Sequence, residues 1–147
     1  MIKMLCLIFL ICFSTFTNAQ DYLDVSVAAY HWNRKATVDN DFNEINTGVG
    51  FTRDVGDERW MAGFYKNSVR KYSTYVLYGY TPIKVGEVKI GFVVGGITGY
   101  QYIIVPAAGL LLTYQPSCNL GINLLATPNF PKNNVYGFLG LQLRFKL

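Results

Sequence analysis

Apolar side chains recur at every second residue near both ends of this 147-residue chain. In the segment YLDVSVAAY, the two faces carry Leu23, Val25, Val27 and Ala29 on one side and Asp24, Ser26, Ala28 and Tyr30 on the other. In VYGFLGLQLRFKL, every second residue from Leu139 to Leu147 is apolar. A repeat of two residues is the period of a β-strand, because successive side chains point to opposite faces. Both segments are therefore predicted strands.

The middle of the chain is apolar, but it is a poor candidate for membrane-spanning helices. No charged residue occurs from Gly91 to Pro131. Glycines and prolines interrupt this segment repeatedly, and both residue types destabilise the interior of a helix. Several strands fit the segment better than one or two helices.

Eight predicted strands follow one another along the chain, and compact turns alternate with longer loops between them. Their number is even, and several have about the 9 to 11 residues that a tilted strand needs to cross a bilayer. The predicted fold class is all-β, an eight-stranded antiparallel up-and-down transmembrane β-barrel. The strands are expected at 22–31, 45–53, 60–67, 72–81, 86–95, 103–114, 118–126 and 135–147.

The two faces of the last strand distinguish a membrane barrel from a secreted lipid carrier. Gln142, Arg144 and Lys146 share one face with Gly140, while the opposite face is wholly apolar. A soluble carrier turns its apolar face inward and its polar face outward. We expect the polar face to line the lumen and the apolar face to meet lipid. Aromatic residues near both predicted rims, Trp32, Tyr22 and Trp60 among them, are typical of interfacial girdles.

The first 19 residues have the features of a secretory signal peptide. Lys3 precedes an apolar run from Met4 to Phe13, and Ala19 provides a small residue for cleavage. The predicted organisation is a signal peptide at 1–19 and one barrel domain at 20–147, located in the outer membrane of a Gram-negative-type cell. The alternative is a retained anchor, for which the apolar run is short.

Composition excludes several classes of function. Without Lys3, 12 basic and 9 acidic side chains remain, a net charge of +3 that indicates no nucleic-acid surface. Cys118 is the single cysteine after cleavage, so no intrachain disulfide is possible. One histidine and one cysteine cannot build a usual metal site. We expect no metal, no cofactor and a monomeric barrel.

The strand order predicts that two distant residues meet at one rim. If both termini lie at the turn end, the first strand reaches the loop end at His31 and the third reaches it at Asn67 and Ser68. An imidazole beside a serine hydroxyl can serve as base and nucleophile in acyl chemistry. The alternative is that His31 is a loop residue and Asn67 and Ser68 belong to an ordinary hairpin turn.

The order of these motifs resembles the lipid A palmitoyltransferases of Gram-negative outer membranes, the PagP family. The motifs are His31, FNE at 42–44, the glycine-rich TGVGF, GFYKNSVRKYSTYVLYGY and the alternating terminal strand. Members of that family are eight-stranded barrels that move a palmitoyl chain from a phospholipid to lipid A. The resemblance implies the same partners here, with His31 and Ser68 at the positions of the family's histidine and serine.

Asn67 departs from the family pattern, which has an aspartate at this position. The resemblance makes Asn67 a third candidate catalytic residue, but an amide cannot stabilise an imidazolium with a full charge. The analogous exchange in a serine protease costs about 10⁴ in rate. Asp39, Asp41 and Glu44 in the first long loop are the candidates for a replacement carboxylate.

The resemblance also implies where an acyl chain is held. Tyr78 and Gly79 correspond to the family's substrate-binding position, where a glycine forms the floor of a cavity that measures the hydrocarbon chain. Inward-facing glycines, Gly50 and Gly140 among them, leave room for such a chain, unless they serve to ease the curvature of the strands.

Two prolines are candidates for a lateral gate. Pro106 interrupts the sixth predicted strand and Pro128 follows the seventh. Proline cannot donate a hydrogen bond to a sheet, so a weak seam between these strands would give a lipid chain a sideways path into the lumen. A bulge at Pro106 and an ordinary loop at Pro128 are the alternative.

The sequence thus favours a barrel enzyme that transfers or hydrolyses an acyl chain on lipid A or phospholipid. A non-enzymatic structural or surface-modifying barrel is the second interpretation, and a secreted lipid carrier is the third.

Overall fold

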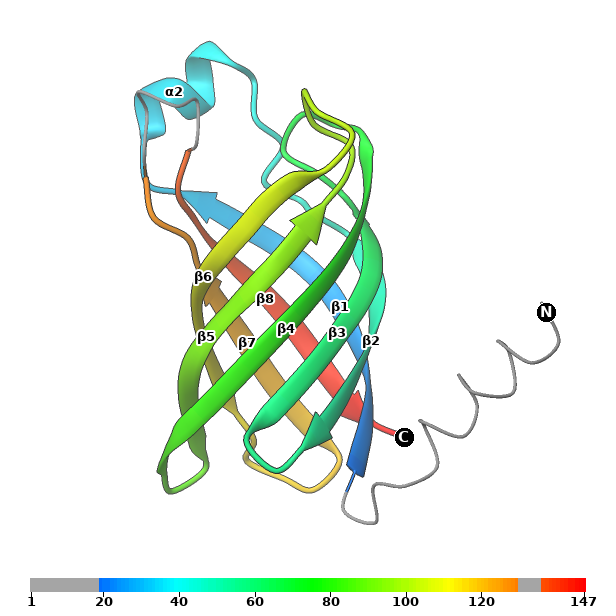
Figure 1. The fold of residues 1–147 in the computed structure, drawn as a ribbon. Coiled ribbons are helices and arrows are strands. Elements are labelled where there is room, and N and C mark those ends of the chain that lie inside the picture. Colours follow the sequence, from blue (N-terminus) through cyan, green and yellow to red (C-terminus); the bar gives the residue numbers. More distant parts are fainter. Residues whose placement is uncertain (1–18, 130–135) are drawn as a thin grey trace, which may run out of the picture.

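The computed structural model describes residues 19–129 and 136–147, which form a closed barrel (Figure 1). The predicted signal peptide lies outside the described residues except for Ala19. All neighbouring strands are antiparallel, and β8 closes the barrel on β1. This confirms the predicted fold class. The strands are β1 Ala19–His31, β2 Gly48–Val55, β3 Glu58–Lys66, β4 Tyr72–Val85, β5 Val88–Ile97, β6 Val105–Tyr114, β7 Leu120–Ala126 and β8 Phe138–Lys146.

The two ends of the barrel differ, as predicted (Figure 1). At the turn end, β2 joins β3 and β4 joins β5 through two residues each, since Val55 pairs with Glu58 and Val85 with Val88. Gly56 and Gly86 have φ angles of 63° and 57°. Two-residue hairpins need such left-handed backbone, which glycine adopts without a steric cost. The loop end carries the longer connections.

The sequence did not predict the short helix α2, Arg34–Asp39, in the first long loop. Asn33 caps it, because the Asn33 side chain accepts a hydrogen bond from the Ala36 amide at 3.0 Å. Among the described residues, no helix is long and apolar enough to span a bilayer. The position of α2 matters because it brings Arg34 to the rim of the barrel.

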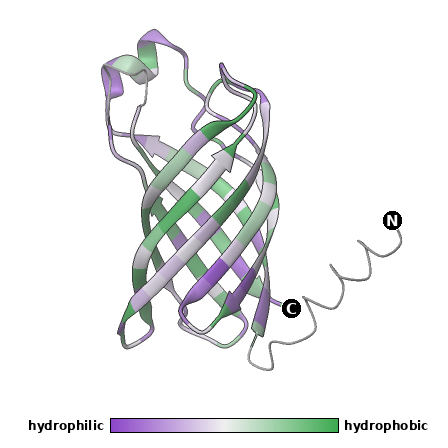
Figure 2. Ribbon diagram, viewed as in Figure 1, coloured by the Kyte–Doolittle hydropathy of each residue, from purple (hydrophilic) through white to green (hydrophobic). Residues whose placement is uncertain are grey.

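The barrel is apolar outside, and its interior is polar toward the turn end, as the last strand predicted. Hydrophobic and hydrophilic positions alternate along the strands in Figure 2. Large apolar side chains exposed on the outer face include Leu23, Val49, Phe51, Trp60, Phe64, Val76, Phe92, Val94 and Leu110. Such a band suits contact with hydrocarbon, because lipid-facing positions cannot satisfy polar groups.

Buried ion pairs fill the lumen toward the turn end. Arg59 donates two hydrogen bonds to Asp54, at 2.6 and 2.8 Å, and Arg144 approaches the same carboxylate at 3.4 Å. The Arg144 guanidinium lies 3.7 Å from the centre of the Tyr22 ring. Tyr22 is therefore an interior residue and not a girdle residue, which corrects the expectation for the aromatic rim. Above this polar layer, Met61, Tyr75, Leu77, Val93 and Leu111 form an apolar cluster.

A bulge in β1 reverses the faces of its last residues. Ser26 pairs with Gln142 and Ala28 pairs with Leu141, so Val27 is an extra residue between them. Strict alternation groups Tyr30 with Asp24 on the inner face. In the structure, Tyr30 is 51% exposed and His31 is 2% exposed. The bulge therefore turns His31 into the barrel.

Candidate functional site

His31 and Ser68 meet at the loop end of the barrel, where the strand order predicted them. Nε2 of His31 lies 2.9 Å from Oγ of Ser68. On the other side of the ring, Nδ1 lies 3.3 Å from Oε1 of Glu44. A proton on Nδ1 directed at this carboxylate leaves the Nε2 lone pair free to accept the proton of the serine hydroxyl. The three side chains have the order of a nucleophile, a base and an acid that orients the base.

Glu44 is held by more than the imidazole. Its Oε1 accepts a hydrogen bond of 2.6 Å from Nη1 of Arg34 and one of 2.9 Å from the backbone N–H of His31. These contacts, with Arg34 the largest contribution, lower the pKa of Glu44 from 4.5 to about 2. The carboxylate is therefore charged at neutral pH. Of the acids of the first long loop, Glu44 contacts the imidazole, whereas Asp41 pairs with Arg70.

Aromatic side chains enclose the imidazole. The ring centres of Phe42 and Phe138 lie 5.1 and 5.9 Å from that of His31. Tyr136 packs against the far side of Phe42, at 5.3 Å between ring centres. These rings restrict the rotation of His31 and shield its two hydrogen bonds from water, which strengthens them.

Two asparagines fasten the first long loop to the turn that carries Ser68. The backbone N–H of Asn43 donates to the Ser68 carbonyl at 2.7 Å, and the Asn43 side chain donates to the Asn67 carbonyl at 3.3 Å. The Asn46 side chain donates to the Lys66 carbonyl at 2.9 Å. Because Glu44 lies between the two asparagines, these bonds fix the carboxylate relative to the serine.

Asn67 does not contact His31 and has a different function from that of an acid beside an imidazole. Its Oδ1 accepts hydrogen bonds from the backbone N–H groups of Val69 and Lys71, at 3.0 and 2.9 Å. Its Nδ2 donates to the Ser73 hydroxyl at 2.9 Å and to the Gly99 carbonyl at 3.0 Å. This fully buried amide closes the Ser68 turn and ties it to the loop after β5. An aspartate at this position could not donate to the Gly99 carbonyl.

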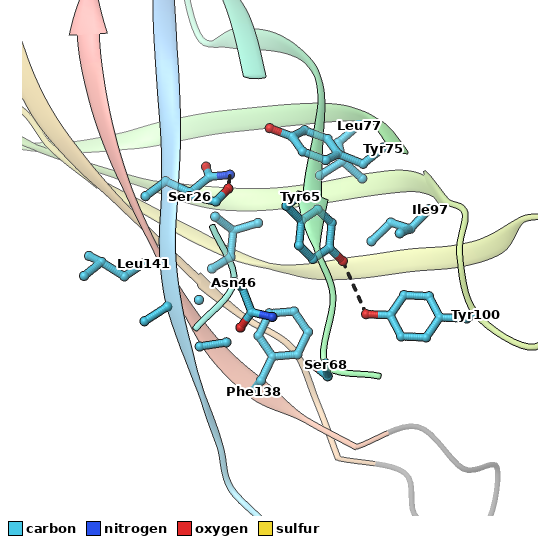
Figure 3. A pocket seen from close by; sticks show the side chains of 15 residues that line it. Ser26, Asn46, Tyr65, Ser68, Tyr75, Leu77, Ile97, Tyr100, Phe138 and Leu141 are labelled. Atoms are coloured by element: carbon cyan, nitrogen blue, oxygen red, sulfur yellow. Dashed lines mark hydrogen bonds between the residues drawn. The ribbon is translucent and has the colours of Figure 1, made fainter. Parts of the chain in front are cut away.

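A pocket opens beside Ser68 in the loop half of the barrel (Figure 3). Its cavity has a volume of about 80 Å³, which is smaller than the roughly 300 to 1,000 Å³ of common ligand pockets. Apolar side chains dominate its wall, Leu77, Ile97, Leu125, Phe138 and Leu141 among them. Ser68 and three tyrosines, Tyr65, Tyr75 and Tyr100, supply polar groups at the wall. These tyrosines were not predicted as site residues.

The residues expected to form the floor lie elsewhere. Tyr78 packs against Trp60, with ring centres 5.1 Å apart, and Trp60 lies on the outer face. Gly79 faces the lumen, but it lies next to Val93 and Arg59 and does not line the pocket. On β4 it is Leu77, two residues nearer the loop end than Gly79, that lines the pocket.

The inward glycines differ in what fills the space beside them. A side chain at Gly50 would collide with the Tyr75 hydroxyl, and one at Gly63 would lie 2.7 Å from the same atom. These two glycines therefore make room for the Tyr75 side chain. Gly140, by contrast, lines the pocket.

The two prolines flank the shortest ladder of the barrel. Pairing between β6 and β7 runs from Tyr114 to Leu110, whereas β6 pairs with β5 as far as Val105. Pro106 lies in the part of β6 beyond the last β7 partner, and Pro128 lies two residues past the end of β7.

In the part of the chain that the structure describes, no three His, Cys, Asp or Glu residues are arranged to hold a metal ion.

Comparison with solved structures identifies the architecture. The designed protein TMB2.3, solved by solution NMR, superposes with a TM-score of 0.62 at 22% identity, over 89% of this chain and 98% of that one. A structure described as a de novo designed transmembrane β-barrel gives 0.65 at 15% identity, over 87% and 95% of the two chains. The fold is that of a transmembrane β-barrel. At these identities the likeness concerns the fold alone.

A natural barrel was also found, at a lower score. The crystal structure of Neisserial surface protein A, NspA, gives a TM-score of 0.38 at 14% identity, over 88% of this chain and 96% of that one. No protein-family model and no curated protein matches the sequence. The resemblance to the palmitoyltransferases therefore rests on the residues named in the sequence analysis.

Proposed function

We propose that this chain is an outer-membrane barrel enzyme that transfers or hydrolyses a fatty acyl chain of a membrane lipid. Ser68 is the nucleophile, His31 is the general base and Glu44 orients and stabilises the base. The observation that carries the proposal is the line of contacts from Ser68 Oγ through the imidazole to Glu44, at 2.9 and 3.3 Å. Nucleophile and base within hydrogen-bond reach, with a third group orienting the base, are the signature of covalent acyl catalysis.

The first half of the reaction forms an acyl-enzyme. Ser68 Oγ attacks the ester carbonyl of the lipid while its proton moves to Nε2 of His31. The bond between the carbonyl carbon and the ester oxygen then breaks, and the imidazolium returns the proton to the departing alkoxide. Glu44 stabilises the imidazolium in between, because its carboxylate is charged and faces Nδ1.

The second half releases the acyl group. A hydroxyl group of a second lipid, or water, loses its proton to Nε2 and attacks the acyl-serine. Collapse of the tetrahedral intermediate breaks the bond between the carbonyl carbon and Ser68 Oγ, which takes the proton back from the imidazolium. The product is an acylated lipid or a free fatty acid. The choice between transfer and hydrolysis depends on which hydroxyl reaches the site.

The lining of the pocket supports an acyl substrate. Its wall is mainly apolar and includes Ser68, so the first carbons of a chain whose carbonyl meets the serine would lie among Phe138, Ile97 and Leu77. Burial of each methylene group of the chain contributes about 0.8 kcal/mol. The incomplete ladder at Pro106 supports a sideways entry from the bilayer, since the backbone there makes no ladder bonds to β7.

The location of the site supports a lipid of the outer leaflet. The apolar outer band suits a membrane, and the site lies at the loop end of the barrel. In bacterial outer-membrane barrels the longer loops are extracellular. The acceptor lipid would then be lipid A and the donor a phospholipid.

A non-enzymatic outer-membrane barrel is the second candidate. It is favoured by the comparisons, in which the likeness to designed transmembrane barrels concerns architecture alone. Under this interpretation, the hydrogen bonds among His31, Ser68 and Glu44 hold the loops together and perform no chemistry.

Lipid analysis separates the two candidates. The purified barrel is incubated in detergent micelles with phospholipid and lipid A, and the lipids are weighed by mass spectrometry. We expect one acyl chain to leave the phospholipid and to appear as free fatty acid or on lipid A. Ser68→Ala should abolish both products in a barrel that still folds. A folded wild-type barrel that yields neither product contradicts the proposal and favours the structural role.

A further inference from the structure

Tyr100 brings a second polar group to the nucleophile. It lies in the connection between β5 and β6, and its hydroxyl is 3.3 Å from that of Tyr65 (Figure 3). Tyr65, Tyr100 and the nucleophile Ser68 line the same pocket. Two phenols thus border the space that an acyl carbonyl at Ser68 would enter.

The loop that carries Tyr100 is fastened to the Ser68 turn. Nδ2 of Asn67 donates to the Gly99 carbonyl, and the Ser73 hydroxyl donates to the Thr98 carbonyl at 2.5 Å. Gly99 has a φ of 84°, and a side chain there would lie 2.5 Å from the Tyr72 carbonyl oxygen. The backbone next to Tyr100 can therefore pack this closely only with glycine at position 99. Asn67, which is adjacent to Ser68 in the chain, fixes the distance between the phenol and the serine.

The Tyr100 phenol can donate a hydrogen bond but is not set up to lose its proton. Burial raises the pKa of Tyr100, which keeps the hydroxyl protonated at neutral pH. Preorganised donors that face a developing negative charge are among the largest contributions to catalysis. Neither His31 nor Glu44 can fill this role, because His31 faces the serine proton and Glu44 is an anion.

We propose that Tyr100 donates a hydrogen bond to the oxyanion that forms when Ser68 attacks the acyl carbonyl. The inference rests on the proposed acyl chemistry and names the group that stabilises its tetrahedral intermediate. In this arrangement Tyr65 donates to the Tyr100 oxygen, which the 3.3 Å contact between the two hydroxyls allows, and the Tyr100 O–H is left for the oxyanion. No bond is made or broken at Tyr100, because the phenol shares its proton and keeps it.

The test compares two tyrosines of the same loop. Tyr100→Phe removes the proposed donor, while Tyr102→Phe removes the hydroxyl of a side chain that is 68% exposed and outside the pocket. Loss of one oxyanion donor costs about 10² to 10³ in kcat. We expect Tyr100→Phe to lower kcat for a soluble acyl ester by about 10², with KM nearly unchanged, and Tyr102→Phe to retain wild-type kcat. Tyr65→Phe should lie between them.

Binding provides a readout that does not depend on turnover. A long-chain alkylboronic acid forms a tetrahedral adduct with an active-site serine, whereas the matching fatty acid does not. We expect Tyr100→Phe to weaken boronate binding by about the same factor as kcat, with fatty acid binding unchanged. Equal weakening of both ligands would mean that Tyr100 shapes the pocket and would overturn the inference.

The outcomes distinguish this inference from the proposed function. If wild type turns over the ester and Ser68→Ala does not, but Tyr100→Phe keeps wild-type kcat, the acyl chemistry stands and the role of Tyr100 is refuted. If wild type neither turns over the ester nor binds the boronate more tightly than the fatty acid, both are refuted. Resistance of the folded band to detergent before heating confirms that each variant is a barrel.

Discussion

Nε2 of His31 lies 2.9 Å from Oγ of Ser68, although 37 positions separate the two residues in the chain. The barrel creates this contact, because β1 and β3 end at the same rim and the bulge at Val27 turns the imidazole inward. Glu44, in the first long loop, contacts the other side of the His31 ring. The following predictions test what each part of this arrangement contributes.

Glu44→Gln should reduce the acyl turnover and leave the barrel folded. Glutamine keeps the size of the side chain but cannot stabilise an imidazolium by charge. The corresponding change in a serine protease lowers kcat by about 10⁴, and we expect a loss of about 10² to 10⁴ here. The measurement is kcat for a soluble acyl ester. Asp41→Asn, which removes an exposed carboxylate of the same loop, is the matched control.

The pH profile should show one proton on its acid side. The pKa of Glu44 is lowered to about 2, so the stabilisation from its ion pair is complete above about pH 4.5 and is lost as the pH falls toward 2. Glu44 is therefore charged wherever the enzyme works, and protonation of His31 alone should switch it off. We expect log(kcat/KM) to fall with a slope of 1. A slope of 2 between pH 5 and 7 would mean that a second group of the site titrates with His31.

Asn67→Asp should weaken the protein and should not restore a family-like acid. The new carboxylate would face the Gly99 carbonyl without a proton to donate, and an unsatisfied buried group costs about 1 to 3 kcal/mol. We expect the folded band to convert at a lower temperature on a heated detergent gel, together with a lower kcat. Higher activity than wild type would show that an acid at position 67 acts on His31 after all.

Leu77→Ala and Gly79→Met should affect chain-length preference differently. Leu77 lines the pocket, so its truncation should admit a longer acyl chain by about one or two carbons, each methylene group contributing about 0.8 kcal/mol. Gly79 lies below the pocket, where a methionine would press on Val93 and Arg59. Gly79→Met should lower the stability of the barrel without changing the preferred length of the acyl chain. Mass spectrometry of the released acyl groups provides the comparison, and a shorter preferred chain in Gly79→Met would place Gly79 at the floor.

Local patterns were sufficient to predict the barrel. Period-two alternation predicted the faces of β8 and of β1 as far as Ser26, and compact turns alternating with longer loops marked the hairpins. The shared rim of His31 and Ser68 followed from the strand order, because the first and third strands of an up-and-down barrel run in the same direction. All these signals depend on neighbours in the chain, which a sequence displays directly.

The features that could not be predicted depend on contacts between residues that are distant in the sequence. The residues around Val27 give no sign of a bulge. The bulge is defined by how β1 pairs with β8, a strand that lies far away in the sequence. Tyr75 fills the space at Gly50 and Gly63 from another strand, so the glycines alone could not reveal whether their space was empty. The choice of Glu44 over its neighbouring acids depends on Arg34 and on the helix that carries it.

Covalent capture of Ser68 tests the central claim most directly. The folded barrel is treated with a long-chain alkyl fluorophosphonate, which reacts with serines activated by a base, and the modified peptide is identified by mass spectrometry. We predict one adduct, on Ser68, in wild type, and at least a hundredfold slower labelling in His31→Gln, in line with the about 10² to 10⁴ that a positioned base contributes. A folded wild-type barrel that stays unlabelled, or that labels equally fast without His31, would contradict the account.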